Sequence, residues 1–169
     1  RLVMIGNGMA GLRTIEEILE RDSEQYEITI IGKEPYPNYN RIMLSNILQK
    51  KMSVKETIMN SYQWYKTHGI ELVTNDPVIS VNREKKEIIT EKNKQFHYDI
   101  CIFATGSSAF VLPIPGSQLN SVIGWRTIDD TERMIEIAQT NKHAIVIGGG
   151  LLGLECARGL MDQGMEVTV

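Results

Sequence analysis

The beginning of the chain alternates between two hydrophobic periods. Leu2–Ile5 is a continuous apolar run, which predicts a strand buried on both faces. Apolar residues then recur at helical spacing over residues 9–20, with arginine and glutamate opposite them, and residues 26–32 again have the pattern of a strand. A glycine-rich turn at residues 6–11 joins the first strand to the helix. This order predicts one strand–helix–strand unit.

The middle of the chain has shorter apolar segments and more turn residues. The elements expected there, in order, are a loop at residues 35–40, a short helix or turn at 41–48, a loop at 53–58, a helix at 60–68 that ends at Gly69, and a strand at 70–73. Polar tips separate three short β segments at residues 78–81, 87–90 and 96–98, which predicts an antiparallel meander. A buried strand follows at residues 99–104.

The last third of the chain repeats the opening pattern. A helix is expected over residues 129–138, with Thr127 as its N-cap, before a strand at residues 144–147. A second glycine turn, a helix at residues 151–163 and a strand from residue 165 follow. The segment VLPIPG at residues 111–116 holds two prolines and predicts the domain boundary, which divides the chain into residues 1–115 and 116–169.

Both glycine turns carry the motif GxGxxG between a strand and a helix, as Gly6, Gly8 and Gly11 and again as Gly148, Gly150 and Gly153. Such glycines allow the tight turn, let the backbone approach a pyrophosphate and bring the helix close to the strand. The helix N-terminus then offers free N–H groups to the phosphates. We therefore predict an α/β fold, with a Rossmann-like dinucleotide-binding domain that has a parallel sheet and a small antiparallel meander. The start of a second Rossmann-like unit follows it.

Two acidic residues and one strand end add to this picture. Glu34 lies about 20 residues after Gly11, where an acid accepts a hydrogen bond from the adenosine ribose; the alternative is a solvated loop charge. An acid at this position disfavours a 2′-phosphate and favours FAD or NAD at the first site. Glu155 follows the second glycine turn and is a candidate for cofactor binding there; the alternative is a charge on the helix surface or at its cap. The small residues Ala104-Thr105-Gly106 end a strand, either beside a cofactor or as a plain turn.

Composition excludes several classes of function. A net charge of −3 and a pI of about 5.7 leave no basic footprint for nucleic acid or an anionic membrane. No apolar run approaches the roughly 20 residues that span a bilayer. Cys101 and Cys156 lie far apart and inside apolar runs, so we expect packing roles and a reducing compartment, the cytoplasm. The three histidines are scattered, and no metal site is expected.

The two glycine units, with the ATG strand end before the second, resemble the pyridine nucleotide–disulfide oxidoreductase superfamily. This resemblance implies FAD at the first unit and NAD(P)H at the second. The region where disulfide members carry a redox cysteine reads YNRIMLS at residues 39–45 and has none. That stretch is similar to the ferredoxin- and rubredoxin-reductase branch, which implies that Arg41 and Ser45 lie along the FAD. The lysine that often follows the serine there is Asn46 in this chain.

Longer stretches narrow the resemblance: IGNGMAGLRTIEE, EPYPNYNRIMLS, FATGSSAFVLPIPG and IGGGLLGLECARGL. Together they resemble the N-terminal part of the large subunits of assimilatory NAD(P)H nitrite reductases. The resemblance implies sirohaem and an iron–sulfur cluster further along the polypeptide, outside these residues. It also implies a small nitrite reductase subunit as partner and allows a homodimer of the full protein.

The cofactor-binding residues expected on these grounds fall into two groups. For FAD they are Gly6, Gly8, Met9, Ala10, Gly11, Lys33, Glu34, Arg41, Ser45, Val78, Ala104, Thr105, Gly106 and Arg126. For NAD(P)H they are Gly148, Gly150, Leu151, Leu152, Gly153 and Glu155. Strand packing explains Val78 equally well, and a charge at a helix start explains Arg126. We expect no catalytic acid, base or nucleophile, since the hydride chemistry belongs to the cofactors.

The sequence thus favours an NAD(P)H-dependent flavoprotein module that passes electrons towards iron–sulfur and sirohaem centres for the reduction of nitrite to ammonia. A stand-alone ferredoxin- or rubredoxin-type reductase is one alternative. A flavin-binding module without enzymatic activity is the other.

Overall fold

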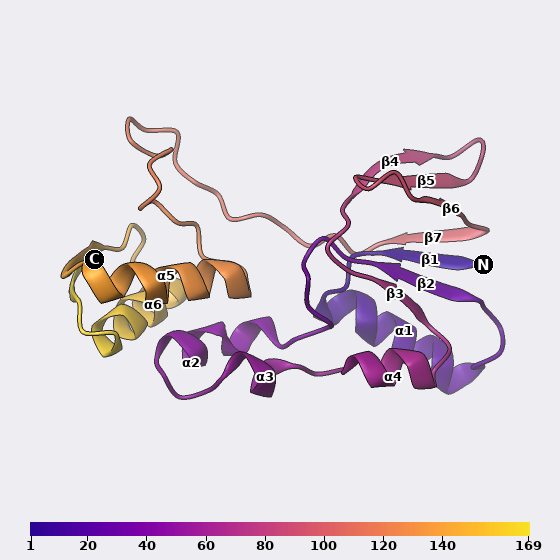
Figure 1. Ribbon diagram of the computed structural model, residues 1–169, viewed down its shortest axis with the longest axis horizontal. Helices are drawn as coiled ribbons and strands as arrows, with labels where there is room; N and C mark the ends of the chain where they lie inside the picture. Colours follow the sequence, from indigo (N-terminus) through magenta and orange to yellow (C-terminus); the bar gives the residue numbers. More distant parts are fainter. The chain divides into compact units, whose positions relative to one another are not determined.

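The computed structural model describes residues 1–169 and divides them into two compact units (Figure 1). Arg1–Tyr39 and Ile58–Ser107 form the first unit, and Asn40–Thr57 and Ser108–Val169 form the second. This grouping differs from the linear division at residue 115, because residues 40–57 pack with the later part of the chain. The assignment of residues 1–115 and 116–169 to the two cofactors remains a prediction.

A four-stranded parallel sheet is the centre of the first unit. Its order is β3 (Glu71–Val73), β2 (Ile28–Ile31), β1 (Leu2–Ile5) and β7 (Ile100–Phe103). Helix α1 (Met9–Arg21) connects β1 to β2, and α4 (Tyr62–Thr67) precedes β3. The chain therefore runs outward from β1 to β3 and returns to the other side of β1 with β7, which makes β1 the point where the strand order reverses.

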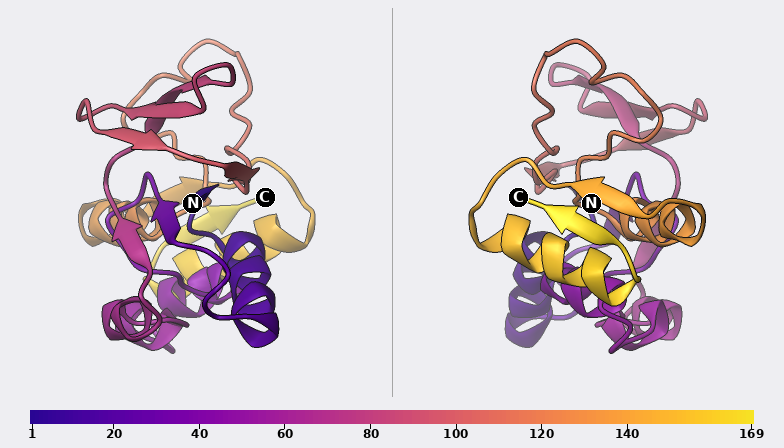
Figure 2. Two further views of the ribbon diagram at one scale, coloured as in Figure 1. Left: turned by 90° about the vertical axis from the view of Figure 1, so that its right-hand side faces the viewer. Right: turned by 90° about the vertical axis from the view of Figure 1, so that its left-hand side faces the viewer.

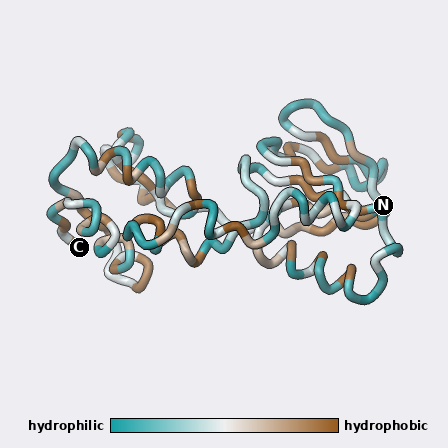
Figure 3. Tube along the Cα trace, turned by 60° about the horizontal axis from the view of Figure 1, so that its bottom comes forward, coloured by the Kyte–Doolittle hydropathy of each residue, from teal (hydrophilic) through white to brown (hydrophobic).

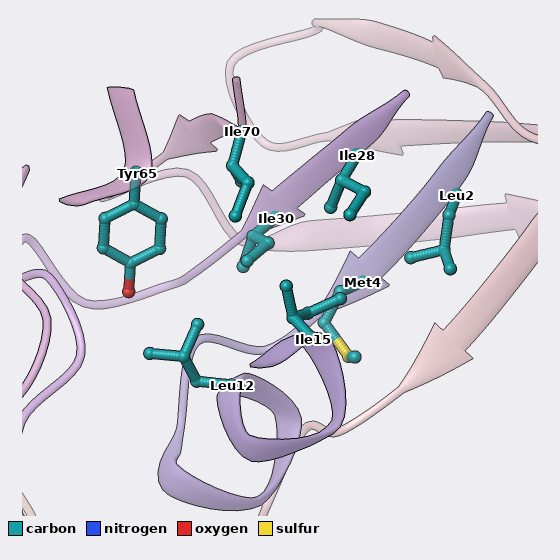
Figure 4. Close-up of a cluster of buried hydrophobic side chains, with 8 residues drawn as sticks. All are labelled: Leu2, Met4, Leu12, Ile15, Ile28, Ile30, Tyr65 and Ile70. Carbon is teal, nitrogen blue, oxygen red and sulfur yellow. The ribbon is translucent and has the colours of Figure 1, made fainter. Parts of the chain in front are cut away.

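The alternate residues of the continuous apolar run enter two different cores. Leu2 and Met4 face α1 and α4, where they pack with Leu12, Ile15 and Tyr65 (Figure 4). Val3 and Ile5 face the opposite side. This arrangement explains why the strand is apolar at every position: both faces of a parallel sheet are covered.

An antiparallel meander covers the second face of the sheet. It consists of β4 (Val78–Asn82), β5 (Glu87–Thr90) and β6 (Gln95–His97) in sequence order. Ile88 and Tyr98 are buried there with Val3, Ile5 and Ile31. The most hydrophobic stretches of this unit gather in its strands (Figure 3). The predicted parallel sheet with a small meander is confirmed.

The second unit packs helices against a short parallel pair of strands. Its elements are the 3₁₀ turn η1 (Arg41–Met43), α2 (Leu44–Leu48), α3 (Val54–Thr57), α5 (Ile128–Thr140), β8 (His143–Ile145), α6 (Leu151–Asp162) and β9 (Glu166–Thr168). Strands β8 and β9 pair in parallel, and α6 connects them (Figure 2, right). Leu48 of α2 is buried against α6, because Gly159 lacks a Cβ that would collide with it.

Several predicted boundaries shift in the structure. The loop expected at residues 53–58 is wrong, since Val54–Thr57 forms the short helix α3. Ser53 and Glu56 explain this helix locally, because the Glu56 carboxylate accepts hydrogen bonds from the backbone and hydroxyl of Ser53. The strand expected from residue 26 begins at Ile28, and the helix expected from residue 60 begins at Tyr62. No helix has the length and apolarity that crossing a bilayer requires.

Candidate functional site

The first glycine turn lies at the carboxyl edge of the parallel sheet, directly after β1. The Gly6 N–H donates to the Ile31 carbonyl at 2.8 Å, and the Ala104 N–H donates to the Ile5 carbonyl at 2.8 Å. The turn is therefore held between the ends of β2 and β7. In open α/β sheets ligands bind outside the carboxyl ends of the strands, at the point where the strand order reverses.

Gly6 and Gly11 are required for the close packing of this turn. Gly6 has φ of +112°, and a Cβ there would overlap the carbonyl group of Ala104. A Cβ on Gly11 would lie 2.9 Å from the Ala104 Cβ and 3.1 Å from the Gly6 carbonyl oxygen. Each distance is shorter than an ordinary van der Waals contact. These two glycines thus fit helix α1 against β1 and β7.

Gly8 is different, because it faces open space. A Cβ on Gly8 would meet no heavy atom within 4 Å. Gly8 is also the N-cap of α1, where no side chain caps the helix and the first turn carries no acidic residue. The backbone N–H groups of Met9 and Ala10 therefore lie at an uncapped helix N-terminus, which favours the binding of an anion such as phosphate.

Glu34 follows the end of β2 and is half-buried. The Tyr39 hydroxyl donates a hydrogen bond of 2.6 Å to Glu34 Oε2, and the Asn75 N–H donates to the Glu34 carbonyl at 3.0 Å. Tyr39 itself is buried. The Glu34 carboxylate is therefore held by its surroundings and is not a freely solvated loop charge, whereas the neighbouring Lys33 is exposed.

The remaining first-unit residues are placed as follows. Ala104 is half-buried beside Gly6 and Gly11, and Thr105 and Gly106 are exposed after the end of β7. Val78 begins β4, is half-buried and packs on the buried cluster around Val3. The structure thus brings Ala104 to the glycine turn, and it supports a packing role for Val78.

Arg41, Ser45 and Arg126 belong to the second unit. Arg41 Nη1 donates to the Arg126 carbonyl oxygen at 2.9 Å, so the structure brings these two residues together. The Ser45 side chain is buried, and its hydroxyl donates to the Ile42 carbonyl at 3.4 Å. The Arg126 N–H donates to Asp130 Oδ2, within the cap of α5. The backbone N–H of Arg126 therefore takes part in the start of α5, and both interpretations of its side chain stay predictions.

The second glycine turn shares several features with the first, although a Cβ on Gly148 would meet no heavy atom within 4 Å. Gly148 has φ of +119°, and a Cβ on Gly153 would overlap the Gly148 carbonyl oxygen. Gly150 is the N-cap of α6 without a side-chain cap, and a Cβ there would meet nothing within 4 Å. Leu151 and Leu152 are exposed in the first turn of α6, and Glu155 is half-buried one turn later. The turn has the features of a second dinucleotide site.

The structure contains no group of three or more His, Cys, Asp or Glu residues that would hold a metal ion. Cys101 and Cys156 are both free. Burial raises the pKa of both thiols above its ordinary value, because the low-dielectric surroundings disfavour the thiolate.

Sequence reasoning missed four residues around the first turn: Asn7, Asn38, Tyr39 and Tyr65. Asn38 and Tyr65 are almost completely buried, at 1% exposed, and both bond to Asn7 inside the glycine motif. The polar Asn7 between two motif glycines was the available indication, since the GxG spacing itself does not require a polar residue there. Its partners are far away in sequence, so the spacing of the motif does not reveal them.

Comparison with known proteins places this geometry in context. A family model described as "Pyridine nucleotide-disulphide oxidoreductase" matches residues 1–169. The nitrite reductase [NAD(P)H] of Bacillus subtilis is 50% identical over 169 residues, which are 100% of this chain and 21% of that protein. The assimilatory nitrate reductase electron transfer subunit of the same organism is 48% identical over 100% of this chain and 22% of its own length. The chain thus spans about a fifth of these relatives.

A solved structure is similar over nearly the whole chain. The NADH:rubredoxin oxidoreductase from Clostridium acetobutylicum matches with a TM-score of 0.89 and 25% sequence identity. The match covers 99% of this chain and 43% of that one.

Proposed function

This chain belongs to the pyridine nucleotide-disulphide oxidoreductase family, and we propose that its first glycine turn holds the pyrophosphate of FAD and its second turn that of NAD(P)H. The observation that carries the proposal is the open side of the first turn. Gly6 and Gly11 are closed by packing, whereas Gly8 leaves space beside an uncapped helix N-terminus. A phosphate group fits both the space and the positive end of the helix dipole.

The residues around this turn fit the other parts of FAD. Glu34, held by Tyr39, would accept hydrogen bonds from the adenosine ribose. Ala104, Thr105 and Gly106 offer a small-residue edge beside the turn. Arg41 and Ser45 are proposed to lie along the cofactor on the strength of the family motif. The assignments of Lys33, Val78 and Arg126 to this site remain predictions.

FAD bound at the first turn would supply the redox chemistry, namely acceptance of a hydride from NAD(P)H and release of the electrons one at a time. The chain's own residues bind and orient the two nucleotides, and no acid, base or nucleophile of this chain is assigned to the chemistry. Burial raises the pKa of the Cys101 and Cys156 thiols, which disfavours the reactive thiolate form of each.

We propose further that the module delivers its electrons to iron–sulfur and sirohaem centres for nitrite reduction, in a cytoplasmic protein that works with a small nitrite reductase subunit. The support is the 50% identity to an NAD(P)H nitrite reductase along the whole chain. The centres themselves would lie outside these residues.

Anaerobic mixing with NADH tests the proposed function. The purified protein, reconstituted with FAD, should lose its flavin absorbance on the timescale of turnover, because hydride transfer reduces the flavin. NADPH in a parallel sample identifies the preferred nucleotide. A protein that binds FAD but is not bleached by either nucleotide would be a passive flavin binder, and one that binds no FAD would contradict the proposal.

The second candidate is a stand-alone reductase of a small iron–sulfur protein, favoured by the likeness to the rubredoxin oxidoreductase. Oxidation of NAD(P)H by the full-length protein, which would carry the iron–sulfur and sirohaem centres, separates the two functions. Dependence of the rate on nitrite supports the first, and dependence on added rubredoxin or ferredoxin supports the second.

A further inference from the structure

A closed ring of hydrogen bonds lies behind the first glycine turn. The Asn38 N–H donates to the Tyr65 hydroxyl oxygen at 3.2 Å, and the Tyr65 hydroxyl donates to Asn7 Oδ1 at 2.8 Å. Asn38 Nδ2 closes the ring by donating to the Asn7 backbone carbonyl at 3.1 Å. The ring therefore joins α4 and the segment after β2 to the residue between Gly6 and Gly8.

The ring acts on the backbone of the turn as well as on its side chain. The chain has no cis peptide bond, so the Gly8 N–H points opposite to the Asn7 carbonyl that shares its peptide plane. Asn38 holds that carbonyl on its own side. The Gly8 N–H is consequently directed away from Asn38, and the space around Gly8 is open.

Stability alone does not explain Asn38. Its side chain is 1% exposed, and its Oδ1 atom is buried without a hydrogen-bond partner. A buried polar atom without a partner destabilises the folded state, and an apolar residue of similar size would avoid this cost. An asparagine at this place is better explained by what its Nδ2 does to the glycine turn.

Tyr65 is suited to remain a donor. Its ring lies among the apolar side chains of Leu12, Ile30 and Ile70 (Figure 4). Burial raises the pKa of Tyr65 to about 12. The hydroxyl therefore stays protonated, and its hydrogen bond to Asn7 persists well above neutral pH.

We propose that Asn7, Asn38 and Tyr65 are positioning residues that preset the first glycine turn for the pyrophosphate of FAD. The proposal rests on FAD binding at this turn, and it adds a polar device to the motif. The glycines make room for the phosphates, and the ring fixes the direction of the N–H group that meets them. A turn preset in this way loses less conformational freedom when the ligand binds.

Tyr65→Phe tests the ring, with Tyr62→Phe as its matched control. Both tyrosines lie on α4, but the Tyr62 hydroxyl is outside the ring and donates to the Pro35 carbonyl at 2.8 Å. Tyr65→Phe should raise the Kd of the purified protein for FAD about tenfold, because two ring partners lose their bonds. Tyr62→Phe should change the Kd by less than about twofold.

The ³¹P resonances of the bound FAD pyrophosphate give a readout that a general loss of stability would not move. They should shift in Tyr65→Phe and stay in place in Tyr62→Phe. If Tyr65→Phe does not fold, Asn7→Ala removes the same acceptor from a half-buried position and should give the same two results. The positioning role of the ring would be contradicted by any of three results. These are an unchanged Kd for FAD in the ring variant, an equal loss of affinity in Tyr62→Phe, and unshifted ³¹P resonances. Absence of FAD binding in the unaltered protein would instead overturn the proposed function.

Discussion

The three glycines of the first motif have different physical reasons for being glycine. Gly6 adopts φ of +112° and touches the carbonyl of Ala104, so its requirement comes from the fold. Gly8 has extended backbone angles and open space around it, so the fold does not require a glycine there. A ligand that approaches the backbone would explain a glycine there, as would the preference of helix N-caps for small residues.

Alanine substitutions at Gly6 and Gly8 should separate the requirement of the fold from the requirement of the ligand. Gly6→Ala should lower the free energy of unfolding of the cofactor-free protein by about 3 kcal/mol, because it adds both strain and a clash. Gly8→Ala should change it by less than about 1 kcal/mol but raise the Kd for FAD at least about tenfold. Urea unfolding and fluorescence titration measure the two quantities. Normal FAD binding by Gly8→Ala would contradict the pyrophosphate assignment.

Tyr39 should matter through Glu34. Tyr39→Phe removes the hydroxyl that bonds Glu34 Oε2 and keeps the buried ring. We expect the Kd for FAD to rise about three- to fivefold, the effect of one hydrogen bond, and to rise further in Glu34→Ala. In the Glu34→Ala background, Tyr39→Phe should have no additional effect. Additive losses in the double variant would show that Tyr39 acts independently of the carboxylate.

At the residue scale, the sequence predicted the groups that a motif spaces and missed those that the fold brings together. The GxGxxG glycines and Glu34 are set by one strand–helix–strand unit, whose length is nearly constant. Asn38 and Tyr65 reach Asn7 only because β2 pairs with β1 and Tyr65 of α4 packs in the apolar cluster on the same face of the sheet. No local pattern records such long-range partners.

At the element scale, long periodic segments were predictable and short ones were not. The predicted strands and helices of both glycine units are confirmed. They were predictable because their apolar side chains pack into the buried clusters and so impose a regular spacing on the sequence. Helix α3 has four residues, too few for a periodicity, and it depends on the local hydrogen bonds that the Glu56 carboxylate accepts from Ser53. The grouping of residues 40–57 with the second unit depends on the contact of Leu48 with Gly159, which the sequence does not show.

The N-terminus of α5 supports a prediction about an element. The Thr127 side chain accepts from the Asp130 N–H, and the Asp130 carboxylate accepts from the Thr127 N–H, which is a capping box. Thr127→Ala should lower the free energy of unfolding by about 1 kcal/mol. Thr140→Ala at the exposed end of the same helix is the control, and we expect a change of less than about 0.5 kcal/mol. Equal effects in urea unfolding would exclude a capping contribution.

At the scale of the whole molecule, the chain carries one uncapped glycine turn in each of its two compact units. The residues proposed for NAD(P)H all lie in the second unit. Gly8 and Glu34, proposed for FAD, belong to the first unit, whereas Arg41 and Ser45, assigned to FAD by the family motif alone, belong to the second. The two nucleotides should therefore leave different footprints on the chain.

Hydrogen exchange with each nucleotide alone tests this division. A ligand at about 100 times its Kd adds about 2.7 kcal/mol to any opening that releases it. FAD should slow exchange in β1 and α1. Protection of α2 as well would support the assignment of Arg41 and Ser45 by the family motif, since Ser45 lies in α2 and Arg41 in the turn before it. Oxidised NAD should slow exchange at the start of α6 and leave β1 and α1 unchanged. Protection of β1 and α1 by FAD without any in α2 would remove Arg41 and Ser45 from the site while leaving the glycine turn in place. If FAD slowed exchange in α6 and NAD did not, the two turns would have been assigned to the wrong nucleotides.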